Sequence, residues 1–244
     1  MAASTMLDLL RLFTAESPAW KVDRIARALH VSAATAYRYV AHLQRAGLVD
    51  GSAGGYYTLG PAVIEFERLI RLGDPVLKAA APRMLQLRRS LGRSCTVQLW
   101  RCYRDCVVLV HSESPRSRGD EKRGSVVSLF EGAPSQAILA ALPIHVLRRL
   151  FRKRAAEIAR SKLGRTWREF CLRLRDIDAT GWCDARSRSA AGVAIAAAIH
   201  VDGAVLGSLS VEVAARKSRR SIEAIGSKVS MTARRVARVV SNRS

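Results

Sequence analysis

The stretch Val31–Arg45, VSAATAYRYVAHLQR, decides how the first part of the chain folds. Ser32 is a favoured residue for starting a helix, because its hydroxyl can accept a backbone N–H of the first turn. The alanines that follow have high helix propensity. An apolar stripe at spacings of three and four then runs along one side, and we expect it to comprise Tyr37, Val40, Ala41, Leu43 and Leu48. The stretch therefore predicts a helix that buries one side.

The other side of this helix carries small and hydrogen-bonding side chains, namely Ala33, Thr35, Arg38, His42 and Arg45. Small residues let a helix approach another molecule closely, and the polar ones can donate or accept hydrogen bonds at base edges. This pattern is typical of a recognition helix that lies in the DNA major groove. The residues predicted to contact DNA are Ser32, Ala33, Thr35, Tyr37, Arg38, His42, Arg45 and Gly54.

The flanking segments support a winged helix-turn-helix. Val22–His30 is a short amphipathic helix, joined by a tight turn to the next helix. Gly47 stands where a left-handed residue ends a helix. Residues 48–59 predict a hairpin with a glycine-rich turn at 51–55, which would be a wing that lies along the phosphates or reaches the minor groove. The alternative is a plain three-helix lobe that packs on the rest of the chain.

These segments resemble a known family. LDLLRLFTAE, VDRIARALHVSAATAYRYVAHLQRAGLV and YYTLG are similar to the N-terminal winged helix of the isocitrate lyase regulator (IclR) family. The pair Thr35 and Arg38, the ending LxxxGLV and the closing Tyr-x-Leu-Gly are the most specific matches. The resemblance continues more weakly through the rest of the chain. It implies a DNA-binding transcription regulator with a ligand-sensing second domain.

The length of 244 residues suits one small and one medium domain. We expect a winged helix-turn-helix at 1–60, a linker helix at 61–73 and an effector-binding, oligomerising domain at 74–244. The linker PAVIEFERLIRL begins with Pro61 and has an apolar stripe with no obvious partner in the wing. We expect it to pack against its own copy or against the second domain.

No apolar run is long enough for a membrane span, and the first residues lack the pattern of a signal peptide. We therefore expect a cytoplasmic protein with no membrane partner. The five cysteines are odd in number and form no CxxC pair, which favours reduced thiols. Cys102, Cys106 and His111 could suggest a metal, but no fourth ligand is suitably spaced, so we expect small core residues. No metal and no cofactor are predicted.

The formal net charge of +21 favours a polyanionic partner. The charge is unevenly distributed, because residues 1–72 hold eight basic and six acidic residues, a net of +2. The remainder holds 33 basic and 14 acidic residues, a net of +19. This excess can be a solvated surface, added non-specific attraction for DNA, or attraction for an anionic ligand.

In the second domain, helices and strands are mixed in an order that predicts an α+β sandwich. Helices are expected at 76–91, 134–141, 144–151, 166–179 and 218–240. Strands are expected at 94–100, 105–111, 125–129, 190–200 and 204–213, the last two joined by a turn at Asp202-Gly203. The family resemblance implies a sheet like that of GAF-type sensing domains.

The resemblance also implies where a ligand binds, between the sheet and the segment 129–140. The residues predicted to contact an effector are Ala133, Pro134, Ser135, Cys183, Ser187, Ile195, Ser208 and Ser210. Where the family has acidic residues, this chain has Arg186 and Arg188. The exchange would favour an anionic ligand, unless the arginines face solvent or the ligand has been lost.

No nucleophile elbow, phosphate-binding loop, metal triad or dinucleotide fingerprint occurs, so we expect no enzyme. The leading hypothesis is a sequence-specific transcription regulator controlled by a small organic acid, with an aromatic acid as one option. Two copies would bind an inverted repeat in double-stranded DNA as a homodimer, with pairing of dimers into a tetramer left open. The alternatives are a ligand-independent DNA-binding protein whose second domain serves only assembly, and a ligand-binding enzyme with an attached winged helix.

Overall fold

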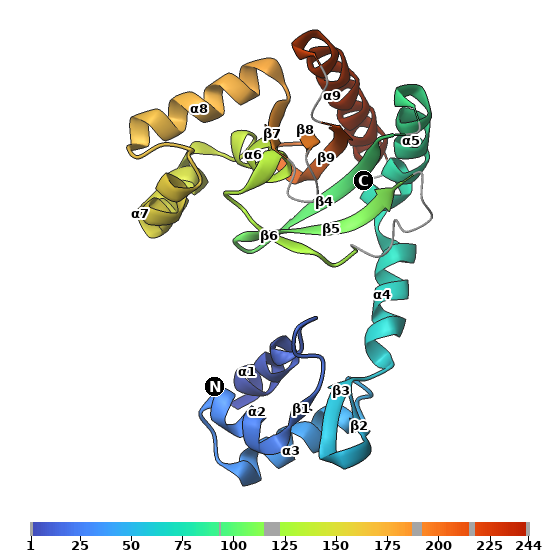
Figure 1. The fold of residues 1–244 in the computed structure, drawn as a ribbon, viewed down its shortest axis with the longest axis vertical. Coiled ribbons are helices and arrows are strands. Elements are labelled where there is room, and N and C mark those ends of the chain that lie inside the picture. The colour runs from blue at the N-terminus through green and yellow to red at the C-terminus, as the bar shows by residue number, and fades with distance from the viewer. Residues whose placement is uncertain (1, 93, 115–122, 187–191, 215–217, 243–244) are drawn as a thin grey trace. The chain divides into compact units, whose positions relative to one another are not determined.

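The computed structural model describes residues 2–92, 94–114, 123–186, 192–214 and 218–242 (Figure 1). The chain divides into two compact units, Met1–Asp74 and Pro75–Ser244. Each unit has its own hydrophobic core. The α+β class predicted from the sequence is confirmed.

The first unit is a helical lobe with a small antiparallel sheet of strand order β1-β3-β2. Its elements are α1 (Ala2–Asp8), a 3-10 turn (Leu9–Leu12), β1 (Trp20–Lys21), α2 (Val22–Leu29), α3 (Ala33–Arg45), β2 (Val49–Ser52), a second 3-10 turn (Ala53–Gly55), β3 (Tyr56–Leu59) and α4 (Ala62–Gly73). The order confirms the winged helix-turn-helix. The sequence missed β1, which is only two residues long and pairs with β3 through Trp20 and Tyr57.

The first unit differs from expectation at its start. The periodicity of residues 4–14 predicts one helix, but the α-helix ends at Asp8 and continues as a 3-10 turn. Leu9 in that turn is fully buried in the core of the lobe, while Leu7 is 54% exposed. The tighter turn brings Leu9 to face the core, so packing decides the local geometry over helix propensity.

The second unit is a six-stranded antiparallel sheet of order β6-β5-β4-β9-β8-β7 with helices on both faces (Figure 1). Its strands are β4 (Thr96–Tyr103), β5 (Cys106–Glu113), β6 (Val126–Ser128), β7 (Cys183–Arg186), β8 (Gly192–Val201) and β9 (Ala204–Ala214). Its helices are α5 (Pro75–Leu91), α6 (Gly132–Ala140), α7 (Ile144–Arg160), α8 (Trp167–Thr180) and α9 (Arg219–Ser241).

Two cores lie on the two faces of this sheet, because side chains alternate along each strand. Val97 and Leu99 pack with α5 and α9, whereas Trp100 packs with α6, α7 and α8. The β8–β9 hairpin turns at Asp202 and Gly203, whose φ angles of 47° and 81° are the left-handed pair that a tight hairpin requires.

Helix α7 is longer than the sequence suggests, since the pattern predicts residues 144–151 and the helix reaches Arg160. Arg154 breaks the regular geometry at φ −131°. The second half adds Ile158 to the core shared with α6 and α8. None of the helices in the described ranges is long and apolar enough to cross a membrane.

Candidate DNA-binding surface and ligand cavity

Helix α3 begins as its sequence predicts. The Ser32 side chain accepts the Thr35 backbone N–H at 3.2 Å, and the Ser32 hydroxyl also donates to Thr35 Oγ1 at 3.0 Å. The preceding helix ends at His30, which is left-handed at φ 55°. Beyond α3, Gly47 is left-handed at φ 69°, and the Leu48 N–H returns to the Leu43 carbonyl at 2.9 Å. These caps hold α2 and α3 in a tight helix-turn-helix.

The buried side of α3 is formed by Ala36, Tyr39, Val40 and Leu43. The sequence-based stripe is therefore wrong at two positions, since Tyr37 is 57% exposed and Ala41 is also exposed. Tyr39 takes the core position instead, because residues 36, 39, 40 and 43 share one side of a 3.6-residue helix. The correction places the Tyr37 ring on the solvent side.

The residues predicted to contact DNA lie on the exposed surface of the first unit. Arg38 is exposed and makes no ion pair with any described residue. Arg45 Nη2 lies 3.0 Å from His42 Nδ1, so these two side chains hold each other. Ser32, Ala33 and Gly54 are exposed, and Thr35 is partly exposed. Among the described residues, no carboxylate forms an ion pair with Arg38, His42 or Arg45 on this exposed side of α3.

Two cations of the first unit, one on β1 and one on α2, lie over aromatic rings. Lys21 from β1 lies over the Tyr56 ring of β3, 4.8 Å from its centroid. Arg24 stacks on Trp20 at 4.6 Å. Gly54 and Gly55 have φ of 77° and 75°, a backbone that side chains disfavour. Aromatic rings thus orient two cations on the same lobe, which the sequence alone did not reveal because β1 was not predicted.

A cavity of about 320 Å³ lies in the second unit, over the sheet face that carries α6. The first turn of α6 contributes Gly132, Ala133 and Pro134. The other lining residues come from the strands and their ends: Gln98, Trp100, Leu109, Ser125, Val126, Val127, Glu131, Arg186, Ala194 and Glu212. The walls therefore combine apolar surface, an indole and a few polar groups, as ligand cavities usually do.

The start of α6 gives this cavity an electrostatic character. Glu131, the residue before the helix, makes no capping hydrogen bond with its side chain. The first backbone N–H groups of a helix lack partners within the helix, and their dipoles favour an anion. Arg186 adds a cation, whereas Glu131 and Glu212 add carboxylates. The cavity can therefore hold a molecule with an acidic end and a hydrogen-bond donor.

The structure brings only part of the predicted effector set to this cavity. Ala133 and Pro134 line it. Ser135 is fully buried, and its hydroxyl donates to the Ser128 carbonyl at 2.8 Å. This hydrogen bond ties the first turn of α6 to the end of β6. Cys183 is buried and its Sγ lies 3.3 Å from the Ala133 carbonyl. Ser187 lies outside the described residues.

The remaining three predicted residues lie on β8 and β9. The prediction that Ile195 lines the cavity is wrong, because its side chain lies on the opposite face of the sheet and packs with α5 and α9. Ser210 is buried below the cavity, where it accepts from Trp100 Nε1 at 3.0 Å and donates to Gln98 Oε1 at 3.4 Å. Ser208 is fully buried, and its hydroxyl has no hydrogen-bond partner among the residues that the structure describes.

Sequence reasoning missed Gln98 and Trp100 as lining residues. A signal was present, since Gln98 is a polar residue inside the apolar strand segment TVQLW. Strand alternation places Gln98 and Trp100 on one face, but the sequence could not say which face carries the cavity. The expectation that Cys102 and Cys106 are core residues is wrong for Cys102, which is exposed, while Cys106 is partly buried. Among the described residues, no cluster of three His, Cys, Asp or Glu could hold a metal ion.

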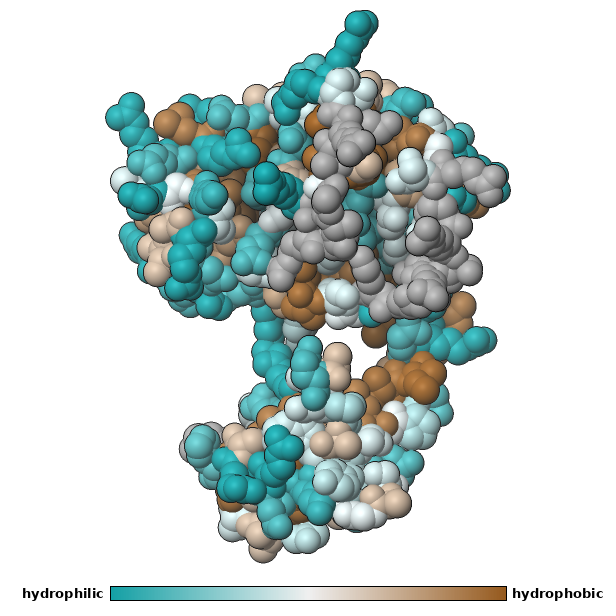
Figure 2. All heavy atoms as spheres, in the orientation of Figure 1, coloured by the Kyte–Doolittle hydropathy of each residue, from teal (hydrophilic) through white to brown (hydrophobic). Residues whose placement is uncertain are grey.

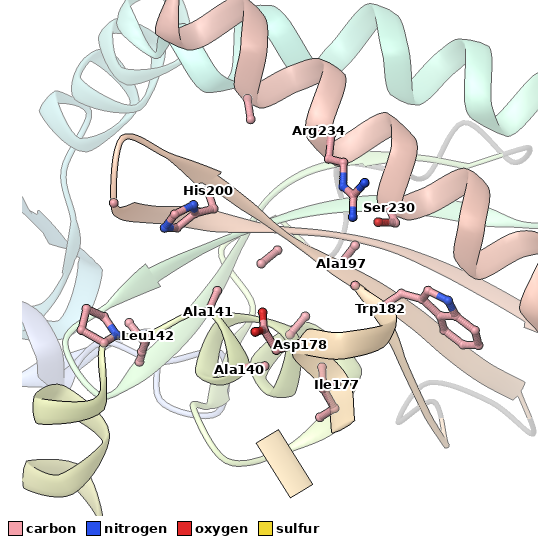
Figure 3. A pocket seen from close by; sticks show the side chains of 16 residues that line it. Ala140, Ala141, Leu142, Ile177, Asp178, Trp182, Ala197, His200, Ser230 and Arg234 are labelled. Carbon is pink, nitrogen blue, oxygen red and sulfur yellow. The ribbon is translucent and has the colours of Figure 1, made fainter. Parts of the chain in front are cut away.

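A second, larger cavity of about 560 Å³ lies at the sheet edge (Figure 3). The strand β7 pairs with β8 up to Ala196, so residues 197–201 form an edge there. In Figure 3, Arg234 and Ser230 of α9 approach from one side, and Asp178 of α8 from the other. None of the predicted effector residues that the structure describes lines this cavity.

Comparison with known proteins decides the family. The IclR helix-turn-helix domain model matches residues 4–51, and the model of the bacterial transcriptional regulator IclR C-terminal matches residues 73–238. The chain belongs to the IclR family. It is therefore an IclR-type DNA-binding transcriptional regulator, and α3 is the second helix of the matched helix-turn-helix. No curated protein is matched significantly by the sequence.

Solved IclR structures share the fold over nearly the whole length. A putative IclR regulator from a Silicibacter species is 21% identical, with 99% of this chain and 96% of that chain covered at a TM-score of 0.77. An IclR regulator from Alicyclobacillus acidocaldarius is 20% identical, with 98% of each covered at 0.78. An IclR homologue from Microbacterium hydrocarbonoxydans, complexed with 4-hydroxybenzoate, is 18% identical, with both chains fully covered at 0.75.

Proposed function

We propose that this regulator reads an operator with α3 and that a small organic acid in the 320 Å³ cavity controls its DNA binding. The observation that carries the ligand half is the first turn of α6, which opens on a cavity lined by Trp100 and Arg186. A helix start and a guanidinium favour a carboxylate, and an indole favours an aromatic body. The regulator acts in the cytoplasm.

A hydroxylated aromatic acid fits the composition of the lining best. Its carboxylate would take the side of Arg186 and the α6 start, and its hydroxyl would donate to Gln98 or Glu212. The cavity volume lies near the lower end of the range of about 300–1,000 Å³ that is usual for small-molecule sites. The relative crystallised with 4-hydroxybenzoate supports this choice of ligand class as a first probe.

The DNA half of the proposal rests on the open side of α3. Arg38 and Thr35 would contact base edges, and the wing would follow the phosphates. Two copies would place their α3 helices in successive major grooves of an inverted repeat, with half-sites about 10 bp or a multiple apart. Ligand binding would bias the DNA-competent arrangement by about 1–3 kcal/mol, a 5- to 150-fold change in affinity.

Helix α4 supports the pairing of two copies. None of its residues is buried, and its exposed apolar side chains are Ile64, Phe66, Leu69, Ile70 and Leu72, with exposures from 51% to 72%. Figure 2 shows hydrophobic surface along this segment. Five large apolar side chains on one helix are too many to leave in water, so we propose that α4 packs against its copy in a homodimer. Pairing of dimers into a tetramer remains compatible with this contact.

The ligand proposal is tested in two steps. Genome-wide capture with the purified protein supplies an operator fragment, and fluorescence anisotropy then measures its affinity with and without 4-hydroxybenzoate or benzoate. We expect the acid to change DNA affinity and to raise the melting temperature of the wild-type protein. Arg186→Gln should weaken the response to the acid, while the matched variant Arg234→Gln in the larger cavity should leave it intact.

The second candidate is a ligand-independent regulator whose second unit serves only assembly. The carboxylates Glu131 and Glu212 in the cavity favour this alternative, since they oppose an anion. This alternative is supported if no organic acid in a test panel changes either the melting temperature or the operator affinity of the protein. Equal loss of the response in the Arg186 and Arg234 variants would also remove the cavity assignment.

A further inference from the structure

The excess basic charge of the second unit is most concentrated on α7 and the segment after it. Residues 144–168 contain nine Lys and Arg but one acidic residue, Glu157. The inward side of α7 packs Leu147, Leu150 and Ile158 into the core with α6 and α8. The helix is thus anchored by its apolar side, and its polar side faces outward. Figure 2 shows strongly hydrophilic surface over α7 and α8.

Four cations gather on two successive turns of this outward side. Arg148, Arg149, Arg152 and Lys153 line a shallow surface depression together with Ile144 and His145. We call these four residues the α7 basic face. Residues four apart lie about 6 Å apart along a helix axis, so the face presents two parallel rows of charge. All four side chains are exposed.

The nearby carboxylates do not neutralise this face. Arg154 takes both of them, with Nη2 3.0 Å from Asp105 Oδ2 and Nη1 3.4 Å from Glu157 Oε2. Arg148 lies over the Trp167 ring at 5.8 Å. Among the described residues, no acidic side chain forms an ion pair with any member of the α7 basic face. Like charges at such spacings repel one another on a helix, so a bound polyanion would relieve an unfavourable arrangement.

We propose that the α7 basic face is a second DNA-contacting surface, which binds phosphates of the duplex without reading its sequence. The cations are spread along two turns instead of converging on one point, so they suit a polymer of phosphates better than a single small anion. Three of the four are arginines, whose planar guanidinium groups pair well with phosphate oxygens. Duplex DNA is the polyanion that a helix-turn-helix regulator already meets.

The salt dependence of DNA affinity measures this contact directly. Each neutralised phosphate adds about 0.9 to the slope of log affinity against log salt concentration. Full-length protein is titrated into a labelled duplex of about 40 bp and arbitrary sequence, at about 50 to 200 mM KCl. An arbitrary sequence isolates the non-specific contacts, so the outcome does not depend on how α3 reads an operator.

The test variant is R149Q/R152Q/K153Q, which leaves Arg148 on Trp167. The matched control is K228Q/R235Q/R238Q on α9, which removes the same charge from exposed positions on the helix that covers the opposite face of the sheet. We expect the α7 variant to lose about two to three units of slope, since each lost phosphate contact removes about 0.9. The α7 variant should also bind the duplex at least tenfold more weakly than wild type at low salt. The slope of the α9 control should lie within one unit of the wild-type slope.

Two outcomes overturn the proposal. If the two triple variants have equal slopes, only the net charge of the protein matters for DNA binding. If the slope of the α7 variant equals that of wild type, the α7 basic face does not contact DNA and instead faces solvent or binds an acidic protein. Circular dichroism checks folding. If the triple variant does not fold, the single variants R149Q and R152Q should each lose about one unit of slope. The charge-preserving R149K/R152K should lose none.

Discussion

The indole Nε1 of Trp100 donates to Ser210 Oγ at 3.0 Å, and this bond joins β4 to β9 beneath the 320 Å³ cavity. Ser210 in turn donates to Gln98 Oε1, so a hydroxyl that nothing in solvent can reach orients two of the lining side chains. The floor of the cavity is therefore a satisfied polar network inside an apolar sheet face.

The first prediction compares two serines on β9. Ser210→Ala should lower the free energy of unfolding by about 1–3 kcal/mol, because the buried indole N–H loses its acceptor. Ser208→Ala, two residues away and equally buried, should be neutral or stabilising, because the Ser208 hydroxyl has no partner to lose. Urea unfolding of both variants measures the difference. Equal losses would contradict the bond's importance.

The second prediction concerns the recognition helix. Arg38→Ala should weaken operator binding by about 1–3 kcal/mol, the usual size of one good base contact, and leave the melting temperature unchanged because Arg38 is exposed. Anisotropy on a captured operator measures the loss. Arg11→Ala removes the same charge from the same unit and serves as the control. Operator binding at wild-type strength by the Arg38 variant would refute the assignment.

The third prediction concerns the start of α3. Ser32→Ala removes the acceptor of the Thr35 N–H and should lower the stability of the first unit by about 1 kcal/mol. Ser32→Asp should retain that stability, since aspartate also caps helices and favours the helix dipole. Thermal unfolding followed by circular dichroism reports both. If the alanine and aspartate variants melt together below wild type, the cap is not the cause.

The fourth prediction uses the exposed side of α4. Leu69→Asp introduces a charge into an apolar surface and should dissociate the proposed dimer. The control is Arg68→Asp, which changes the charge of the same helix outside the apolar set and should leave the dimer intact. Sedimentation velocity at micromolar concentration gives the state of each. A wild-type protein that sediments as a monomer would end the proposal that α4 pairs two copies.

The fifth prediction is a pH dependence. Burial raises the pKa of the Cys183 thiol to about 12, because the thiolate is poorly solvated there. A cysteine thiol in the unfolded chain has a pKa of about 8.5. The contribution of the buried thiol to the free energy of unfolding is therefore fully present below that pH, and it is lost as the pH rises toward 12. Cys183→Ala should flatten the alkaline loss of stability measured by urea unfolding. A loss of the same steepness in the variant would assign the effect to other groups.

Several features were predictable from the sequence because they depend on contacts between near neighbours. The Ser32 cap, the left-handed Gly47 and the Asp202-Gly203 turn follow from side-chain chemistry and backbone preference within a few residues. The order of helices and strands follows from hydrophobic periodicity. These local signals were sufficient to recognise a winged helix-turn-helix and an α+β second domain.

The cavity could be anticipated only in part. Ala133 and Pro134 were found through the family resemblance, but Gln98 and Trp100 lie more than 30 residues away in sequence and meet them only in the folded sheet. Ile195 was misplaced because a single residue of strand register exchanges one sheet face for the other. The same limit explains Tyr37 and Tyr39, since either ring could have filled the core of the lobe.

By itself, then, the sequence determined the class of protein, the family, the caps and the large positive charge, because each is written in composition or in short spacings. Only the tertiary structure decided which sheet face holds the cavity, which serine has a partner and where the charge of the second unit gathers. Those answers depend on packing between segments far apart in the chain, where burial and pairing outweigh local preference.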